Sequence, residues 1–407
     1  MTGRTAQLGG RPRRSSRIDE AALGLGVAIG AAGLAVASRY LARRAHRAAA
    51  EGLVDWPRAE RIAVNRLAAA PGSLTRSELD AAAAHYEAAM AKVVPLLEQR
   101  LGLPLPGVVE RHAVVSRAGW ARANLVVFRQ LIDRLESRLA TPRDDRGFAA
   151  GVAKLANRFL TTQQIGFLLG FLGTRVLGQY DVALLSAEAK PGRLLFVDEN
   201  VRGTAAALGV PLDDFRTWIC LHEATHAFEF EANDWLRPYL AERIEAQLTG
   251  LLDQARSLQA EGAIAFLRRL RSAEHPLESL MQPEQRRLFR ETQLVMSLLE
   301  GFSDWVMDEA GAEILPNVGT IRERFEARRG ARRSGLERIV ARLTGLDLKL
   351  EQYRRGEQFV AGVAALGGPA AVRLLWQGPE SLPSADEMAQ PRRWVQRMAP
   401  QLLAASA

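Results

Sequence analysis

Cysteine is almost absent from this chain of 407 residues, in which Cys220 is the single example. One cysteine excludes an internal disulfide, and it excludes a structural zinc site that needs several cysteines. The sequence also contains no phosphate-binding loop, no dinucleotide-binding fingerprint and no nucleic-acid-binding motif. The scarcity of cysteine fits a protein of a reducing compartment, and we expect a cytoplasmic location.

Net charge is small over most of the chain, although the formal total is +8. Residues 1–50 carry nine arginines against Asp19 and Glu20, so the remaining residues are nearly neutral. A basic terminus beside a neutral body is poor support for a nucleic-acid-binding face. We therefore expect no nucleic-acid partner.

The segment 21–38, AALGLGVAIGAAGLAVAS, contains no charged residue. As a helix it would be about 27 Å long, just enough to cross the hydrocarbon core of a bilayer. Ala35-Val36-Ala37 also resembles a signal-peptide cleavage site, and a soluble or disordered extension is a third reading. The arginines that follow argue against export. We expect residues 1–50 to form a basic extension whose apolar segment could tether the protein to a membrane.

From residue 51 to residue 407, apolar residues recur at helical spacing in one segment after another. The best strand candidate is 193–197, which could offer main-chain hydrogen bonds to a bound peptide as an edge strand does. We predict a mainly α fold with at most a small β element. It could form two lobes, 51–210 and 211–407, with the functional site between them.

Glycine has two expected uses in these helices. Gly166, Gly170 and Gly173 recur along one apolar helix, which indicates close helix packing rather than a phosphate loop, because no Lys-Ser/Thr follows. The segment 283–310 is expected to be a helix that ends at Gly311.

The stretch WICLHEATHAFEFE contains an H-E-x-x-H motif, His222-Glu223-Ala224-Thr225-His226. Residues four apart share one face of a helix, so His222 and His226 could both ligate one metal ion. Glu223 lies about 100° around the helix and could take a proton from a water at that metal without being a ligand. The motif is embedded in apolar residues, and buried histidines beside a glutamate need a compensating partner. We predict Zn²⁺ as the cofactor and Glu223 as the catalytic base.

The third zinc ligand must come from elsewhere in the chain. The extended motif with a third histidine on the same segment is excluded, because Glu229 and Ala232 occupy the positions of its glycine and histidine. Glu300 lies among apolar residues in LVMSLLEGFSDWVMD and is the expected third ligand. Glu229, Glu231 and Asp308 are the next candidates.

Other polar residues have supporting roles in this prediction. Asp304, one turn beyond Glu300, could accept a hydrogen bond from the non-ligating nitrogen of a zinc histidine, with His222 as the expected partner. Stabilisation of an oxyanion needs a further donor besides zinc. The candidates are Tyr353, Tyr180, His275 and Arg237, although a tyrosine in the core is the commoner role for the two tyrosines.

Both motifs together resemble a family of zincin-like metallopeptidases or hydrolases, formerly a domain of unknown function. Some of its members are associated by annotation with deazaflavin-coenzyme biosynthesis. The stretches LGQYDVALL, GLDLKLEQYRRGEQFV and LWQGPESLP also resemble this family, and the likeness covers residues 53–400. The resemblance implies a mostly helical fold of the gluzincin type, with His222, His226 and Glu300 as zinc ligands and Glu223 as the base. It implies no substrate.

The sequence therefore predicts a zinc-dependent hydrolase, in the first instance a metallopeptidase that acts on a peptide or a small amide-like substrate. The alternative is a non-catalytic protein, stabilised by zinc, that serves as a helical interaction module or scaffold. Glu223 favours the enzyme, because a structural zinc site needs no carboxylate beside its ligands. The oligomeric state does not follow from the sequence.

Overall fold

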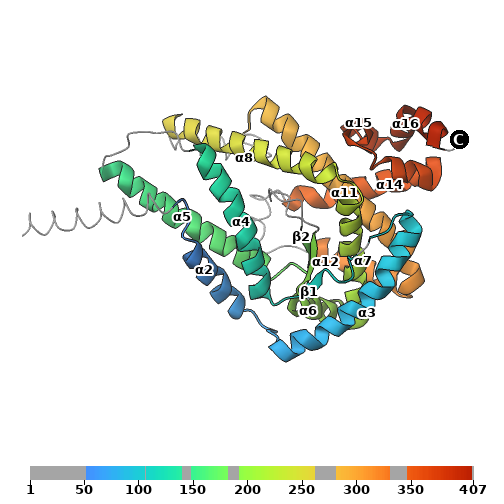
Figure 1. The fold of residues 1–407 in the computed structure, drawn as a ribbon, viewed down its shortest axis with the longest axis horizontal. Coiled ribbons are helices and arrows are strands. Elements are labelled where there is room, and N and C mark those ends of the chain that lie inside the picture. The colour runs from blue at the N-terminus through green and yellow to red at the C-terminus, as the bar shows by residue number, and fades with distance from the viewer. Residues whose placement is uncertain are drawn as a thin grey trace, which may run out of the picture.

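The computed structural model describes residues 52–105, 107–139, 148–181, 192–261, 281–330 and 346–405. Most of these residues are helical (Figure 1), which confirms the predicted mainly α fold with a small β element. The helices are α2 (Trp56–Ala68), α3 (Arg76–Leu101), α4 (Arg117–Leu139), α5 (Phe148–Leu172), α6 (Asp198–Leu208), α7 (Leu212–Glu231), α8 (Leu236–Glu261), α11 (Pro283–Ile314), α12 (Val318–Gly330), α14 (Leu346–Leu374), α15 (Ala385–Ala389) and α16 (Pro391–Ala405), with a 3₁₀ turn at Pro379–Ser381.

A three-stranded sheet lies among the helices. Its strands are β1 (His112–Val114), β2 (Gly178–Asp181) and β3 (Arg193–Phe196), in the order β1-β3-β2. The central strand β3 runs parallel to β1 and antiparallel to β2, with Leu194 opposite His112 on one side and Tyr180 on the other. The prediction that 193–197 is an edge strand is therefore wrong, because both sides of β3 are already paired.

The sheet separates two apolar cores. Alternate residues of a strand point to opposite faces, and here Leu194 and Phe196 join the larger core while Leu195 and Val197 join the smaller one. The smaller core is formed with α2, α4 and α5, which group on the left in Figure 1. The larger core takes its side chains mainly from α3, α7, α11, α14 and α16.

Helices α2 and α5 pack closely in the way that the glycine spacing predicts. A Cβ at Gly166 would lie 2.8 Å from the carbonyl oxygen of Ala59 and from Cβ of Ile62, and one at Gly170 would collide with Arg66. Substituents at these positions would force the two helices apart. Close helix packing is confirmed as the role of these glycines.

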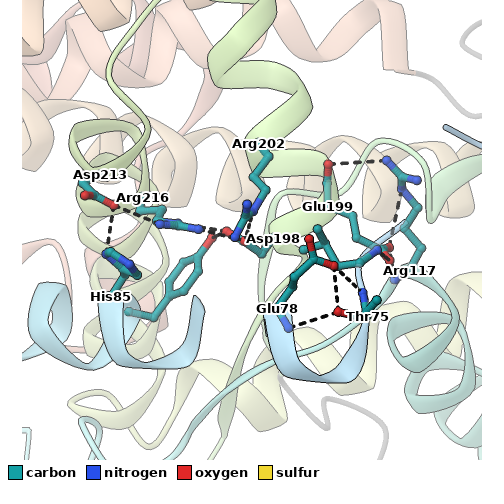
Figure 2. Close-up of polar contacts among 11 residues, drawn as sticks. Thr75, Glu78, His85, Arg117, Asp198, Glu199, Arg202, Asp213 and Arg216 are labelled. Carbon is teal, nitrogen blue, oxygen red and sulfur yellow. Dashed lines mark hydrogen bonds and ion pairs between the residues drawn. The ribbon is translucent and has the colours of Figure 1, made fainter. Parts of the chain in front are cut away.

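Three buried polar residues, Asp198, Glu199 and Asn200, open helix α6, one residue after the end of β3. Asp198 accepts hydrogen bonds from the Arg216 guanidinium at 3.0 and 2.9 Å, from Arg202 at 2.7 Å and from the Tyr86 hydroxyl at 3.0 Å (Figure 2). The two carboxylates, Asp198 and Glu199, lie in the first turn of α6, where the helix dipole favours negative charge. Arg216 belongs to α7, so this contact fixes the start of the helix that carries H-E-x-x-H.

The next two residues extend the same cluster, which we call the α6 polar hub: Asp198, Glu199 and Asn200 with their partners. Glu199 accepts hydrogen bonds from the backbone N–H groups of Leu74 at 3.1 Å and of Arg117 at 2.8 Å. Asn200 accepts one from the Arg117 side chain at 2.6 Å and donates to the carbonyl oxygens of Gly173 and Val176. The hub thus joins both cores.

Helix α11 runs to Ile314, so the prediction that it ends at Gly311 is wrong. Gly311 is buried, and a Cβ there would lie 3.0 Å from Val318 and 3.6 Å from Leu221. The residue is therefore a packing glycine inside the helix. Burial against neighbouring elements offsets the roughly 1 kcal/mol that a glycine costs in a helix interior.

None of the helices in the described ranges is long and apolar enough to cross a bilayer. The candidate tether, residues 21–38, lies outside the described residues. The predicted division into two lobes is not tested by the structure and stays a prediction.

Candidate metal centre

Helix α7 places the two histidines of the motif on one face. The Nε2 atoms of His222 and His226 lie 3.2 Å apart, and both side chains are about 15% exposed. Tetrahedral zinc with metal–nitrogen bonds of about 2.0–2.1 Å holds two nitrogens about 3.3 Å apart. The helix therefore presents the pair at the separation that a shared zinc ion requires.

Glu300 completes the group from helix α11. Its Oε2 atom lies 3.9 Å from Nε2 of His222, and one ligand atom from each of the three residues lies within 4.8 Å of the others. In the part of the chain that the structure describes, no other group of three such side chains is close enough to hold a metal. Two imidazole nitrogens and one carboxylate oxygen are a donor set of catalytic zinc sites, which keep a fourth position open. The residues present fit zinc.

The second ring nitrogen of each histidine is also engaged. Nδ1 of His226 lies 2.7 Å from Oε2 of Glu229, and Nδ1 of His222 lies 2.9 Å from the hydroxyl oxygen of Ser303. With Nδ1–H donating to these acceptors, each ring keeps Nε2 free for the metal. Neither partnership is predicted from the sequence. The i, i+3 spacing of His226 and Glu229 on one helix is a signal that could have found the first.

Asp304, the predicted partner of His222, lies on α11 beside Ser303. It lines a small cavity together with Trp218, one turn before His222, and with Arg322. Its proposed hydrogen bond to His222 stays a prediction.

Glu223 lies beside the three ligands and is itself only 7% exposed. Its Oε2 atom accepts a hydrogen bond of 2.9 Å from the backbone N–H of Tyr180 on strand β2. Burial raises the pKa of Glu223, His226 and the Tyr180 N–H lower it, Glu300 raises it, and the result is about 7. A carboxyl group with a pKa in this range can both take and return a proton near neutral pH.

Glu229 and His226, which also lie on α7, shift each other's pKa. Burial raises the pKa of Glu229 to about 7, although His226 opposes the shift. Burial lowers the pKa of His226, but the carboxylates of Glu229, Glu300 and Glu223 outweigh it and raise the value to about 10. The negative surroundings of His226 therefore favour a cation at this position.

The predicted oxyanion donors lie in different places. The Tyr180 hydroxyl donates to Oε1 of Glu231 at 2.8 Å and lies 3.5 Å from Nη2 of Arg237. Tyr353 belongs to α14, but its side chain is outside the described residues, as is the whole of His275. None of these roles is tested by the structure.

The remaining candidate ligands have other partners. Glu231 forms a two-pronged ion pair with Arg111, at 2.7 and 2.6 Å, and Asp308 pairs with Arg322. Cys220 is fully buried in the larger core, where it packs against apolar side chains.

A helical domain with two histidines and a glutamate on facing helices, and a second glutamate beside them, is the arrangement of a zincin-like metallohydrolase. The profile of the zincin-like metallopeptidase family matches residues 54–395, and the chain belongs to this family. It is also similar to a crystal structure from Chloroflexus aurantiacus, described as a candidate hydrolase with a novel fold. The two chains are 36% identical with a TM-score of 0.62, over 85% of this chain and 99% of the other. Curated proteins provide no match.

Proposed function

We propose that this chain is a zinc-dependent hydrolase, with a peptide or a small amide-like molecule as its substrate. The observation that carries the proposal is the meeting of His222, His226 and Glu300 within 4.8 Å, with the buried carboxylate of Glu223 beside them. Family membership and the likeness to a candidate hydrolase support the same reading.

The three ligands would hold the metal, and zinc in such a site supplies a Lewis acid that polarises a carbonyl and acidifies a water. Glu223 accepts a proton from the attacking water and returns it to the leaving nitrogen, for which a pKa of about 7 is suited. The Tyr180 N–H keeps this carboxylate in place during both transfers.

We assign to strand β2, rather than to 193–197, the main-chain hydrogen bonds to a bound peptide. Strand β2 is a terminal strand of the described sheet, and its Tyr180 N–H points to Glu223 rather than to β3. Gly178, two residues earlier, has its main-chain groups on the same side. We propose that an extended substrate runs along this side of β2, where it would pass the carboxylate of Glu223.

The alternative is a non-catalytic zinc protein. The test is Glu223→Gln, which keeps the side-chain size and removes the basic carboxylate. We expect about one zinc per chain in both proteins, measured by elemental analysis after purification without chelator. Turnover of a substrate found by peptide-library screening should fall by roughly a hundred- to ten-thousand-fold in the variant.

Three outcomes of this test contradict the proposal. Equal turnover in the two proteins would reject Glu223 as the base. Loss of zinc in the variant would reassign Glu223 to the ligands. A parent protein with less than about a tenth of an equivalent of zinc, not restored by added zinc, would reject the metal site itself.

A further inference from the structure

Glu229 is a buried carboxylate with an incomplete set of hydrogen bonds. Its side chain is 0% exposed, one turn beyond His226 on α7. Oε2 lies 2.7 Å from Nδ1 of His226, whereas Oε1 has no hydrogen-bond partner among the described residues. The nearby amide of Asn233 donates to the main-chain oxygen of Glu229 and not to its carboxylate. Among the described residues, the negative charge is thus supported through the His226 imidazole alone.

Among the described residues, no arginine or lysine forms an ion pair with Glu229, and Arg111 pairs with Glu231, two residues farther along α7. An ionised carboxylate in the interior is costly unless a positive charge or several donors stabilise it. A cation on the far side of the His226 ring would supply that charge. This is the side from which Nε2 faces His222.

The other histidine is supported differently. His222 has a neutral hydroxyl, that of Ser303 on α11, at Nδ1. At Nδ1, His226 thus has a carboxylate from its own helix, and His222 has the Ser303 hydroxyl from a neighbouring helix. We therefore expect zinc affinity to depend more on the Glu229 carboxylate than on the Ser303 hydroxyl.

We infer that Glu229 is a positioning residue for the metal, an inference that rests on the proposed function. Its carboxylate directs Nε2 of His226 into the site and, with Glu300, brings two negative charges to balance a divalent cation. Glu229 acts through His226 and is not itself a ligand, because the imidazole stands between its Oε2 and the group of ligand atoms.

The inference is tested by zinc affinity rather than by turnover. Glu229→Gln retains an acceptor for the Nδ1–H and removes the charge, whereas Glu229→Ala removes both. Because the loss of such a partner costs about ten- to a hundred-fold in metal affinity, we expect about ten-fold weaker binding for the first variant and about a hundred-fold for the second. Ser303→Ala should cost less than Glu229→Ala.

Glu231→Gln is the matched control. It removes a carboxylate from the same helix and breaks the ion pair with Arg111, away from the ring nitrogens of His226. Its zinc affinity should equal that of the parent protein, even if its thermal stability falls. The affinities are measured on the full chain by competition with a chromogenic chelator, and metal-free melting temperatures are recorded for every variant.

Cobalt provides a second measurement. At saturating Co²⁺ the visible absorption bands of Glu229→Gln should keep the parent's positions and intensities, because the ligand set is unchanged. Bands typical of another coordination number would show that Glu229 is a ligand, and would overturn the inference. Should Glu229→Ala fail to fold, Glu229→Gln alone decides, since it preserves size and an acceptor.

Two further results would overturn the inference without touching the proposed function. One is a Glu229→Gln protein with parental zinc affinity. The other is a Glu229→Ala protein with a lowered metal-free melting temperature but unchanged zinc affinity, which is the behaviour of a purely structural residue. If the parent protein itself binds no zinc, the proposed function fails instead, so the two failures are distinguishable.

Discussion

The carboxylate of Glu223 lies directly under Gly178, and a Cβ on that glycine would come within 2.6–2.8 Å of the Glu223 Cγ, Cδ and Oε1 atoms. The same carboxylate accepts a hydrogen bond from the backbone N–H of Tyr180, two residues farther along β2. Strand β2 thus leaves room for this side chain at one residue and binds it at another. The position of the Glu223 side chain is thus set by main-chain atoms of β2.

Gly178→Ala should therefore displace Glu223 while leaving the ligands in place. The backbone at Gly178 has no positive φ, so alanine is tolerated locally and the effect falls on the carboxylate. We expect about one zinc per chain and turnover reduced by at least about ten-fold, part of what a positioned base contributes. Gly203→Ala, where a Cβ meets nothing within 4 Å, is the control. Parental turnover in Gly178→Ala would contradict this account.

Glu300→Ala should lower zinc affinity more than any other single change on α11. It deletes the one carboxylate among the three grouped ligands, whereas Asp304→Ala should cost about ten- to a hundred-fold as the loss of a partner to a ligand. Competition with a chelator measures both. Glu300→Ala that binds zinc like the parent would mean that another residue is the third ligand, and Glu229 and Asp308 would be tried next.

Gly356→Ala should destabilise the fold and the metal site together. A Cβ at Gly356 would lie well inside van der Waals contact with the carbonyl oxygen of Ser297, and Gly301 faces Gly356 across the same crossing of α11 and α14. Backbone atoms cannot yield as a flexible side chain can, so the helices must separate and Glu300 must move with α11. We expect a loss of about 1–3 kcal/mol in the free energy of unfolding and weaker zinc binding.

Gly319→Ala is the matched substitution for this test, because a Cβ there meets nothing within 4 Å. Alanine is a better helix former than glycine by about 1 kcal/mol, so this variant should equal or exceed the parent in urea unfolding. A Gly356→Ala protein as stable as the parent would contradict this prediction, because α14 would then move away from α11 without any loss in the free energy of unfolding.

Asp198 should make stability depend on acid pH. Burial raises its pKa, but hydrogen bonds from Arg216, Arg202 and Tyr86 and the charge of Arg216 outweigh this, so the folded value is lowered. The resulting stability is fully present above the unfolded value of about 4 and is lost as the pH falls through the lower folded value. Urea unfolding between pH 3 and pH 7 measures it.

Asp198→Asn should cost about 3 kcal/mol at pH 7, the low end for a broken buried pair, because Arg216 loses its buried partner and keeps, among the described residues, only the exposed carboxylate of Asp213. The difference from the parent should shrink below about pH 4. Asp80→Asn is the control: its ion pair with Arg76 is 62% and 88% exposed, and exposed pairs contribute little. A constant difference between Asp198→Asn and parent across this range would count against the linkage.

We propose that residues 21–38 tether the protein to a membrane, so they should carry the full chain into the membrane fraction of cells. A chain beginning at Val54, where the family match begins, should be found in the soluble fraction and keep its zinc. Uncleaved full-length protein found wholly in the soluble fraction would reject the tether.

The parts of the site that depend on one helix could be predicted from the sequence. Residues four apart share a helix face whatever the rest of the fold does, so His222 and His226 could be paired and Glu223 set beside them. Glu300 could be predicted because an acidic residue in an apolar helix needs a partner and because the family resemblance pointed to the same residue.

The contacts between elements could not be predicted in this way. Ser303 reaches His222 only because α11 crosses α7 at this level. Strand β2, with the sequence GQYD, has no apolar pattern, so the central place of β3 was hidden. The buried polar residues Asp198 and Asn200 look like turn residues, and only the arginines brought to them by other segments reverse that reading.

The α6 polar hub also has a consequence for how the chain unfolds. Its acceptors lie in one stretch of three residues, but its donors and carbonyl partners come from segments as distant as Leu74 and Arg216. In a partly unfolded state with only one core intact, a carboxylate or guanidinium would stay buried in that core without its charge partner. Such states are unfavourable in free energy. Because the hub connects the two cores, we expect them to unfold in a single cooperative transition.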